Sequence, residues 1–255
     1  MKVHVLGSAG SEGPGSNPPA FLIDDFLLMD AGTVALSLDR EEQCRVTHIF
    51  LTHAHLDHIK GIPFLVDNLA LMAEPCQVTI LSGADVLSDL KENMFNNKIW
   101  PDFTTIPTAE HPVMRYQAIS TTAPIAVRNY RIHAVKVSHS VPSYGYLIED
   151  SSRCALVYTG DTGPTKAIWD KMRDFDSKAL IIEVSFPDSM GDLARATGHL
   201  TPSLLQEELS KMHAVPGQIY ISHLKPHYRA EIEAEIAKIT GVDLEILEDG
   251  KAFEI

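Results

Sequence analysis

The sequence has no apolar run long enough to cross a lipid bilayer, and it contains few cysteines. The residues from Met1 to Leu6 alternate like a strand and do not form the apolar core of a signal peptide. Cys44, Cys76 and Cys154 are scattered and include no C-x-x-C pair. These absences predict a cytoplasmic protein with no membrane partner, no disulfide framework and no thiolate zinc site.

Basic residues are also scarce. Lys and Arg total 21 against 34 Asp and Glu, which gives a formal net charge of −13. Phosphate backbones are bound mainly through Lys and Arg, so we expect no nucleic-acid partner. An anionic small molecule is still a possible substrate, because bound divalent cations reverse the local sign of charge inside a site.

The overall composition is that of an ordinary globular protein, with 45% hydrophobic and 22% charged residues. A core of this size supports itself without disulfides or structural metals. A bound metal would therefore serve chemistry. No linker of disordered composition interrupts the chain, and we predict one domain over residues 1–255.

Hydrophobic periodicity predicts strands and helices along the whole chain. Each half contains several strands followed by strand–helix alternation, which fits two packed sheets with helices outside. The expected strands are 2–6, 20–23, 26–29, 46–52, 78–81, 113–119, 125–137, 144–148, 155–158, 180–184, 218–222 and 244–246, and the expected helices are 62–72, 84–95, 164–173, 203–213 and 229–239.

The densest group of polar side chains follows the apolar run 48–52. His53, His55, Asp57 and His58 stand within six positions, directly behind an expected strand. A strand that ends there delivers all four side chains from one loop. Imidazole nitrogen and carboxylate oxygen are the ligands that a zinc-like cation prefers. The cluster predicts a metal site.

Four further polar residues stand at the ends of other expected strands: Asp30, His139, Asp161 and His223. Asp30 taken alone is more typical of a turn or a cap. Ligands from distant parts of a chain can meet where several strands end at one edge of a sheet. The repetition at five strand ends predicts that these side chains complete the metal site.

Three other features leave alternatives open. The loop 7–17 does not fit G-x-G-x-x-G and is either a flexible turn or a loop whose amides contact a ligand. His199 precedes an expected helix that begins with Thr201 as N-cap, so it is either a helix-cap neighbour or an anion-binding residue. Glu183, inside an apolar strand, is either a satisfied polar residue or a functional one.

The stretch Thr-His-Ala-His-Leu-Asp-His over residues 52–58, with Asp30 before it and His139, Asp161 and His223 after it, resembles the metallo-β-lactamase-fold hydrolases over nearly the whole chain. The resemblance implies an α/β fold, a four-layer αββα sandwich, with two divalent metal ions. Zinc is expected first, with manganese or iron as alternatives. Asp30 would orient a ligand. The implied ligands are His53, His55 and His139 for one metal, Asp57, His58 and His223 for the other, and Asp161 as the bridge.

Four further stretches most resemble class II 3′,5′-cyclic-nucleotide phosphodiesterases. They are Ile59-Lys-Gly, Glu183-Val-Ser-Phe, Gly198-His-Leu-Thr-Pro and Ser222-His-Leu-Lys-Pro. The resemblance implies hydrolysis of cAMP or cGMP by a hydroxide shared between the metals. Asp57 would hold that hydroxide in line with phosphorus. His199 would be a phosphate ligand or a general acid, and Glu183 would keep it protonated and oriented. A family-level expectation is a homodimer.

Two alternatives are a runner-up nuclease and a protein of a different class. The chain resembles, less closely, the tRNA 3′-processing endonuclease RNase Z, but it is acidic, lacks an obvious basic arm, and has Glu-Val-Ser-Phe where RNase Z typically has His-Glu-Ala-Thr. A non-hydrolytic diiron or binding protein on the same fold has no need of a His199–Glu183 pair. The aromatic residue that would stack on a base is open among Phe64, Trp100, Phe103 and Phe186.

Overall fold

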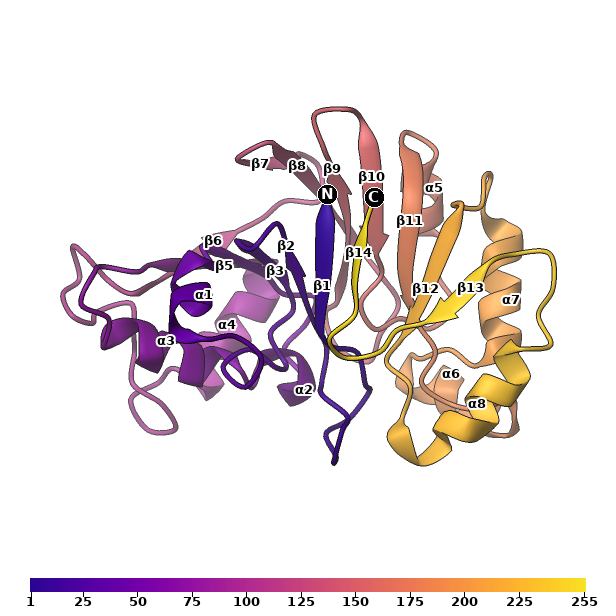
Figure 1. The fold of residues 1–255 in the computed structure, drawn as a ribbon, viewed down its shortest axis with the longest axis horizontal. Helices are drawn as coiled ribbons and strands as arrows, with labels where there is room; N and C mark the ends of the chain where they lie inside the picture. Colours follow the sequence, from indigo (N-terminus) through magenta and orange to yellow (C-terminus); the bar gives the residue numbers. More distant parts are fainter. The chain divides into compact units, whose positions relative to one another are not determined.

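The computed structural model describes residues 1–255, and the chain divides into two compact units (Figure 1). Unit 1 comprises Met1–Gly7, Asn17–Ile119 and Asp249–Glu254, and unit 2 comprises Ser8–Ser16, Ser120–Glu248 and Ile255. Each unit contains one seven-stranded mixed sheet. The expectation of a single domain stays a prediction.

The sheet of unit 1 has the strand order β14-β1-β2-β3-β4-β5-β6. Its strands are β1 (Lys2–Gly7), β2 (Ala20–Ile23), β3 (Leu27–Met29), β4 (His48–Phe50), β5 (Val78–Ser82), β6 (Met114–Ala118) and β14 (Ala252–Glu254). The strands from β3 to β6 are parallel, with Met29 paired to Phe50. Parallel strands end at the same edge of a sheet. The chain segments that follow β3 and β4 therefore lie side by side.

Four helices belong to unit 1: α1 (Arg40–Arg45), α2 (Leu56–Ile59), α3 (Ile62–Ala70) and α4 (Ala84–Asn93). The predicted helices 62–72 and 84–95 are confirmed as α3 and α4. On α3, Ile62, Leu65, Val66 and Leu69 are buried, as the helical spacing of apolar residues requires. Helices α1 and α2 were not predicted, because four to six residues are too few to display a 3.6-residue period.

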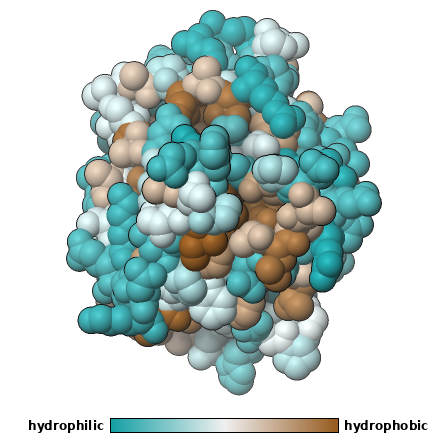
Figure 2. Space-filling model, turned by 90° about the vertical axis from the view of Figure 1, so that its left-hand side faces the viewer, coloured by the Kyte–Doolittle hydropathy of each residue, from teal (hydrophilic) through white to brown (hydrophobic).

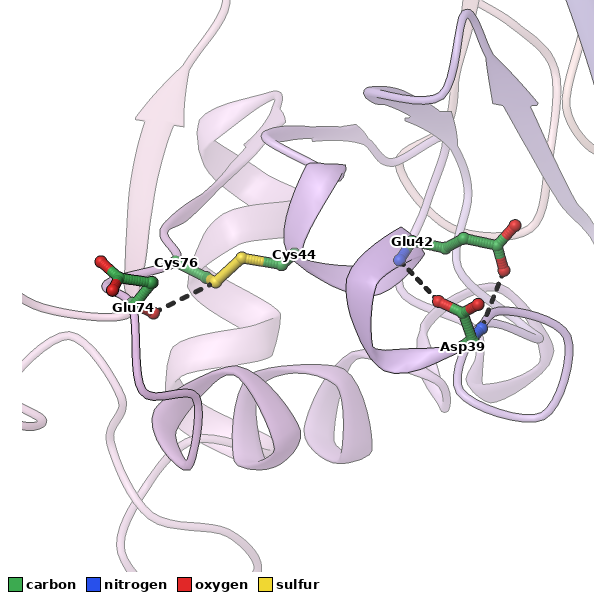
Figure 3. The surroundings of a disulfide bond; sticks show 5 residues. All are labelled: Asp39, Glu42, Cys44, Glu74 and Cys76. Atoms are coloured by element: carbon green, nitrogen blue, oxygen red, sulfur yellow. Dashed lines mark hydrogen bonds between the residues drawn. A yellow bond between two sulfur atoms is a disulfide. The ribbon is translucent and has the colours of Figure 1, made fainter.

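A disulfide joins Cys44 of α1 to Cys76, just before β5 (Figure 3). The Cα atoms lie 5.4 Å apart although 32 positions separate the two cysteines in sequence. The expectation of no disulfide framework did not anticipate this single pair. No spacing pattern marks it, because the folding of α1 beside the segment before β5 brings the two residues together. In the chain-entropy account such a loop closure stabilises by about 3–4 kcal/mol.

The sheet of unit 2 has the strand order β13-β12-β11-β10-β9-β8-β7. Its strands are β7 (Ile125–Val127), β8 (Tyr130–Lys136), β9 (Tyr144–Glu149), β10 (Cys154–Tyr158), β11 (Asp176–Glu183), β12 (Gln218–Ser222) and β13 (Leu244–Ile246). The strands from β10 to β13 are parallel, and Glu183 pairs with Ser222. The segments that follow β10, β11 and β12 thus leave the sheet at one edge.

The helices of unit 2 are α5 (Ala167–Met172), α6 (Gly191–Thr197), α7 (Pro202–Lys211) and α8 (Arg229–Ile236), with 3₁₀ turns η1 (Asp188–Met190) and η2 (Pro226–Tyr228). Side chains of α5, α7 and α8 share a core with every second residue of β11 and β12, and these helices therefore cover one face of the sheet (Figure 1). Thr201 caps α7, as predicted. None of the helices in the structure combines the length and hydropathy that a membrane crossing requires.

Two predicted elements have other bounds in the structure, and two further elements were not predicted. The strand expected over 125–137 is a hairpin, because Arg128 adopts a left-handed φ of 52° that ends β7. The helix expected from Pro164 begins only at Ala167. The segment before His199, where no element was predicted, contains α6. The strand β14, which pairs with β1, follows the last predicted strand and is too short to show a period of two.

Candidate metal-binding and acid–base site

In unit 1 the predicted site residues gather where β3 and β4 end. Asp30 follows β3 with a left-handed φ of 56°, a conformation that costs energy in a residue other than glycine. Its carboxylate is fully buried. It accepts hydrogen bonds from the Thr52 amide at 2.8 Å, the Thr52 hydroxyl at 2.9 Å and His58 Nδ1 at 2.7 Å. These donors offset the cost of burying the charge.

The same contacts determine which nitrogen of each ring carries the proton. A carboxylate can only accept, so the Thr52 hydroxyl donates to Asp30 and must accept from His53 Nδ1, 2.9 Å away. His58 Nδ1 donates to Asp30. In the neutral rings of His53 and His58, Nε2 therefore carries the lone pair. This is the form in which a histidine binds a metal.

The third histidine of the cluster lies against the first. His53 Nε2 and His55 Nδ1 are 2.9 Å apart. Two nitrogen ligands of one zinc-like cation, each at about 2.0–2.1 Å, are separated by about 3 Å. The spacing thus fits joint binding of a cation. Asp57 lies in α2 beside His58 and is half-buried.

In unit 2 His139 lies in the loop after β8, and its Nδ1 donates to the carbonyl of Gly198 at 2.8 Å. Gly198 has φ 73°, and a Cβ there would lie 2.8 Å from the His139 Cα, so only glycine fits. Burial lowers the pKa of His139 below its ordinary value, against the raising effect of the Asp161 charge. The ring is therefore neutral near pH 7, as metal binding requires.

His223 follows β12 and has a left-handed φ of 65°, and it is the second strained residue among the predicted site residues after Asp30. Its Nε2 lies 3.3 Å from Oδ2 of Asp161. A Cβ at Gly10 would overlap the His223 carbonyl, and the His223 amide donates to the Ser8 carbonyl. The glycine-rich loop 7–17 therefore packs against a predicted ligand, which explains why glycine is needed at position 10.

Glu183 and His199, the pair expected to act in acid–base chemistry, are in direct contact. Glu183 is the last residue of β11 and is only 1% exposed. Its carboxylate accepts from His199 Nδ1 at 2.7 Å, from the Ser185 hydroxyl at 2.6 Å and from the Thr162 amide at 3.0 Å. His199 is therefore neither an isolated helix-cap neighbour nor an anion site alone.

The surroundings of His199 favour its protonated form. Burial alone lowers the pKa of His199, but the charge and the hydrogen bond of Glu183, with a further contribution from Asp161, raise the pKa above its ordinary value of 6.5. The nearby Lys225 has a smaller lowering effect. Because Nδ1 is bonded to Glu183, the proton available for transfer is at Nε2.

The ring of His199 lies among three other rings. Its centroid is 5.0 Å from His139, 5.6 Å from His223 and 5.6 Å from Phe186. Of the other aromatic candidates, Phe103 is buried, and Phe64 packs on Trp100. Phe186 is the candidate that contacts a predicted catalytic side chain.

Two hydroxyl residues of the site were missed by the sequence reasoning: Thr52 and Ser185. Each bonds a buried carboxylate and a histidine. A signal was present, since Thr52 directly precedes the histidine cluster and Ser185 stands two positions after Glu183. Neither position shows which partner the hydroxyl meets after folding.

The donor set of unit 2 fits a metal. In the neutral ring of His223, the Ser185 contact places the proton on Nδ1, so a lone pair on Nε2 faces a carboxylate oxygen of Asp161. A cation between two such atoms relieves their repulsion. Ligand atoms of Asp161, His199 and His223 all lie within 4.8 Å of one another. The raised pKa of His199 favours its charged form, whereas the lowered pKa of His139 favours the neutral form that binds a metal, and His139 is therefore the better candidate for the further ligand.

The comparisons with known proteins agree with this chemistry. The family model of the beta-lactamase superfamily domain matches residues 25–224. The chain belongs to this superfamily. The predicted metallo-β-lactamase fold, with two mixed sheets and helices, is confirmed, and yeast PDE1 has a similar structure, with a TM-score of 0.84, 17% identity and 98% of each chain covered.

The curated relatives include proteins named as phosphodiesterases and ribonucleases. A probable 3′,5′-cyclic-nucleotide phosphodiesterase of Yersinia pestis is 28% identical over 72% of this chain, which spans only 58% of that relative. A 3′,5′-cyclic-nucleotide phosphodiesterase of Aliivibrio fischeri is 28% identical over 87% of this chain and 80% of its own. A ribonuclease Z of Methanocaldococcus jannaschii is 24% identical over 62% of this chain and 63% of its own length. The chain is thus a member of the beta-lactamase superfamily with relatives named as phosphodiesterases.

Proposed function

We propose that this chain is a metal-dependent phosphodiesterase that hydrolyses 3′,5′-cyclic nucleotides, cAMP or cGMP, to 5′-monophosphates. The observation that carries the proposal is the buried hydrogen bond of 2.7 Å between Glu183 and His199. A ribose 3′-alkoxide is a poor leaving group, and a protonated imidazole held beside the phosphate supplies the proton it needs.

The proposed metal ligands are the seven side chains that the family resemblance implies. His53, His55 and His139 would hold one divalent ion, Asp57, His58 and His223 the other, and Asp161 both, with zinc as the first expectation and manganese or iron as alternatives. Such ions, when bound, lower the pKa of a coordinated water and neutralise charge on the phosphoryl group. The tautomers assigned above to His53, His58 and His223 support this set.

The residues of the chain itself would bind, orient and move protons. His199 would contact the phosphate and donate the proton at Nε2 to the leaving oxygen. Glu183 would keep the ring charged and turned toward the substrate. Asp57 would accept a hydrogen bond from the attacking water and align it with phosphorus. Phe186, against His199, is the candidate for contact with the base.

The names of two curated relatives support the cyclic-nucleotide assignment. The runner-up is a tRNA 3′-processing endonuclease, which the ribonuclease Z relatives favour. The net charge of −13 supports the first over the second, since a tRNA-binding surface needs basic residues.

A cytoplasmic location and a small-molecule partner stay predictions. The disulfide between Cys44 and Cys76 weighs against a reducing compartment, because disulfides persist mainly under oxidising conditions. Alkylation of freshly isolated native-source protein after denaturation decides this. One modified cysteine, Cys154, indicates an oxidising compartment, and three indicate a reducing one.

A homodimer also stays a prediction. The face in Figure 2 shows brown, apolar groups among teal ones. The large exposed apolar residues of unit 1 are Leu36, Leu56, Phe64, Leu71 and Ile99. Apolar surface of this kind is typical of association sites, although single exposed residues are common. Sedimentation measurements on the wild-type protein test the expectation.

The function is tested by a panel of cAMP, cGMP, pre-tRNA and bis-p-nitrophenyl phosphate. We expect hydrolysis of a cyclic nucleotide to the 5′-monophosphate, loss of activity with a chelator, and recovery with a divalent transition metal. Cleavage of pre-tRNA with cyclic nucleotides left intact would favour the runner-up. Hydrolysis of the synthetic diester alone would support the chemistry and reject both substrates.

A further inference from the structure

Ser185 lies at the centre of the polar network in unit 2. It stands two residues after β11 and is 0% exposed. Its hydroxyl oxygen lies 2.6 Å from Glu183 Oε2, 2.9 Å from His223 Nδ1 and 3.1 Å from His199 Nδ1. One hydroxyl thus contacts the acid–base pair and a predicted metal ligand at the same time.

The direction of each hydrogen bond follows from counting donors. The Glu183 carboxylate only accepts, so the single proton of the Ser185 hydroxyl points to Glu183. The lone pairs of Ser185 Oγ remain for N–H donors. His223 must therefore present a protonated Nδ1 to Ser185. His199 donates from Nδ1 mainly to Glu183 Oε1 at 2.7 Å and also faces Ser185.

The backbone holds this hydroxyl in place. The Ser185 amide donates to the carbonyl of Leu200 at 3.1 Å, next to His199 in sequence. The Ser185 carbonyl accepts from the Lys225 amide at 3.3 Å, two residues after His223. Ser185 is therefore tied by its main chain to both segments whose rings its side chain contacts.

We propose that Ser185 is a positioning residue whose hydroxyl holds His223 and His199 in the Nδ1-protonated form. The consequence is that Nε2 of His223 is presented to a metal and Nε2 of His199 to substrate. Through Glu183, the same hydroxyl couples the metal ligand to the proton donor. The roles of the two Nε2 atoms rest on the proposed function, whereas the tautomers do not.

The first test uses the wild-type protein without metal. Long-range ¹⁵N–¹H correlation spectra at alkaline pH, where imidazole rings are neutral, report which nitrogen bears the proton. We expect both His199 and His223 to be protonated on Nδ1. An Nε2-protonated His223 would overturn the proposal whatever the protein hydrolyses.

The second test compares variants of the full chain. In Ser185→Ala we expect His223 to lose its defined Nδ1 tautomer and the affinity for zinc, measured against a chromophoric chelator, to fall about 10–100-fold. Ser185→Thr keeps the hydroxyl and is expected to stay close to the wild type in both measurements. A Ser185→Thr protein as weak as Ser185→Ala would show that shape, not the hydroxyl, matters, and would contradict the proposal.

A matched control is Ser82→Ala. The Ser82 hydroxyl is equally buried but donates to the backbone carbonyl of Leu51 at 2.7 Å and contacts no histidine. We expect zinc affinity and both tautomers to be unchanged. Equal losses of zinc affinity in the Ser82 and Ser185 variants would reject a specific role for Ser185. Because neither readout uses turnover, a failure of the proposed activity is separable from a failure of this inference.

Discussion

The two units build the same hydrogen-bonded group by different routes. In unit 1 a hydroxyl, Thr52, donates to a buried carboxylate, Asp30, and faces a histidine Nδ1 at 2.9 Å. In unit 2 Ser185 donates to Glu183 and faces His223 Nδ1 at the same distance. In both units the carboxylate also accepts from a second histidine at 2.7 Å.

The chain supplies these groups differently. Asp30 and Thr52 follow two neighbouring parallel strands, whereas Glu183 and Ser185 come from the end of one strand. Each unit also contains one site residue with a left-handed backbone, Asp30 in unit 1 and His223 in unit 2. The same carboxylate–hydroxyl–histidine group is thus built from residues at different sequence spacings in the two units. This recurrence indicates that the hydrogen-bond geometry itself is what the site requires.

The second histidine is where the two groups differ. His58, which is hydrogen-bonded to Asp30, is 0% exposed. His199, which is hydrogen-bonded to Glu183, is 8% exposed, and the charge of Asp161 also raises its pKa. A closed ring suits a permanent metal ligand. A ring with some access and a raised pKa suits proton donation. The difference predicts separate consequences for corresponding substitutions.

The largest expected effect separates the two histidines. His199→Ala should lower kcat on a cyclic nucleotide by about 10²–10⁴-fold, the usual contribution of a general acid, while metal content stays near wild type. His58→Ala should lose metal as well as activity. Steady-state kinetics with elemental analysis of the same samples gives both values. Metal loss in His199→Ala would make His199 a ligand and remove the distinction.

The two carboxylates should differ next. Asp30→Asn removes the acceptor of a predicted ligand, and we expect zinc affinity to fall about 10–100-fold. Glu183→Gln reaches His223 only through Ser185, so its zinc affinity should fall less. Chelator competition on both variants, prepared in parallel, measures the difference. Equal losses of zinc affinity in the two variants would mean that the two carboxylates, through His58 and His199, support metal binding to the same extent.

The hydroxyl of unit 1 should matter as Ser185 does. Thr52→Val keeps the shape but not the hydrogen bond to His53, and we expect about tenfold weaker zinc binding. Thr33→Val is the matched control, because the Thr33 hydroxyl is buried without a hydrogen-bond partner. Unchanged zinc affinity in Thr52→Val would show that the hydroxyl of unit 1 does not support metal binding, and the role proposed for a hydroxyl would then apply to unit 2 alone.

The smallest expected effect is a displacement on the pH axis. Glu183 raises the pKa of His199, so the protonated form survives to higher pH and activity is lost as pH rises through that pKa. In Glu183→Gln the lowering effect of burial remains, and the alkaline limb of kcat/KM should move to lower pH. Ser82→Ala, which leaves Glu183 in place, should keep the wild-type limb. If the alkaline limb of kcat/KM does not move in Glu183→Gln, that limb reports the titration of a group other than His199.

The same shift affects stability in the metal-free protein. A raised pKa means that His199 adds stability below its ordinary value of 6.5, and this contribution disappears as pH rises through the higher folded-state pKa. Denaturant unfolding of metal-free wild type and Glu183→Gln should therefore differ more at acidic than at alkaline pH.

Much of the fold could be predicted because its signals are local. The strand at 218–222 and the helix that begins after Thr201 have clear periodicity and a capping residue, and both are confirmed. The hairpin turn at Arg128 and the short helix α2 were missed, because a left-handed residue or a four-residue helix leaves no periodic trace.

By itself the sequence determined which side chains stand at strand ends, and so which residues are candidates for a metal. The spacing of His53, His55, Asp57 and His58 and the positions of Asp30 and His223 are properties of the chain read in order. Parallel strands bring their ends to one edge, which is why the predicted site residues of each unit lie close together.

Only the tertiary structure decided the protonation of these ligands, the pairing of Cys44 with Cys76 and the need for glycine at positions 10 and 198. Hydrogen bonds, disulfides and steric overlap act over a few ångströms between residues far apart in sequence. The direction of the Ser185 hydroxyl depends on Glu183 and His223 meeting it together. That meeting exists only after folding, and it sets which nitrogen of His223 carries the lone pair for a metal.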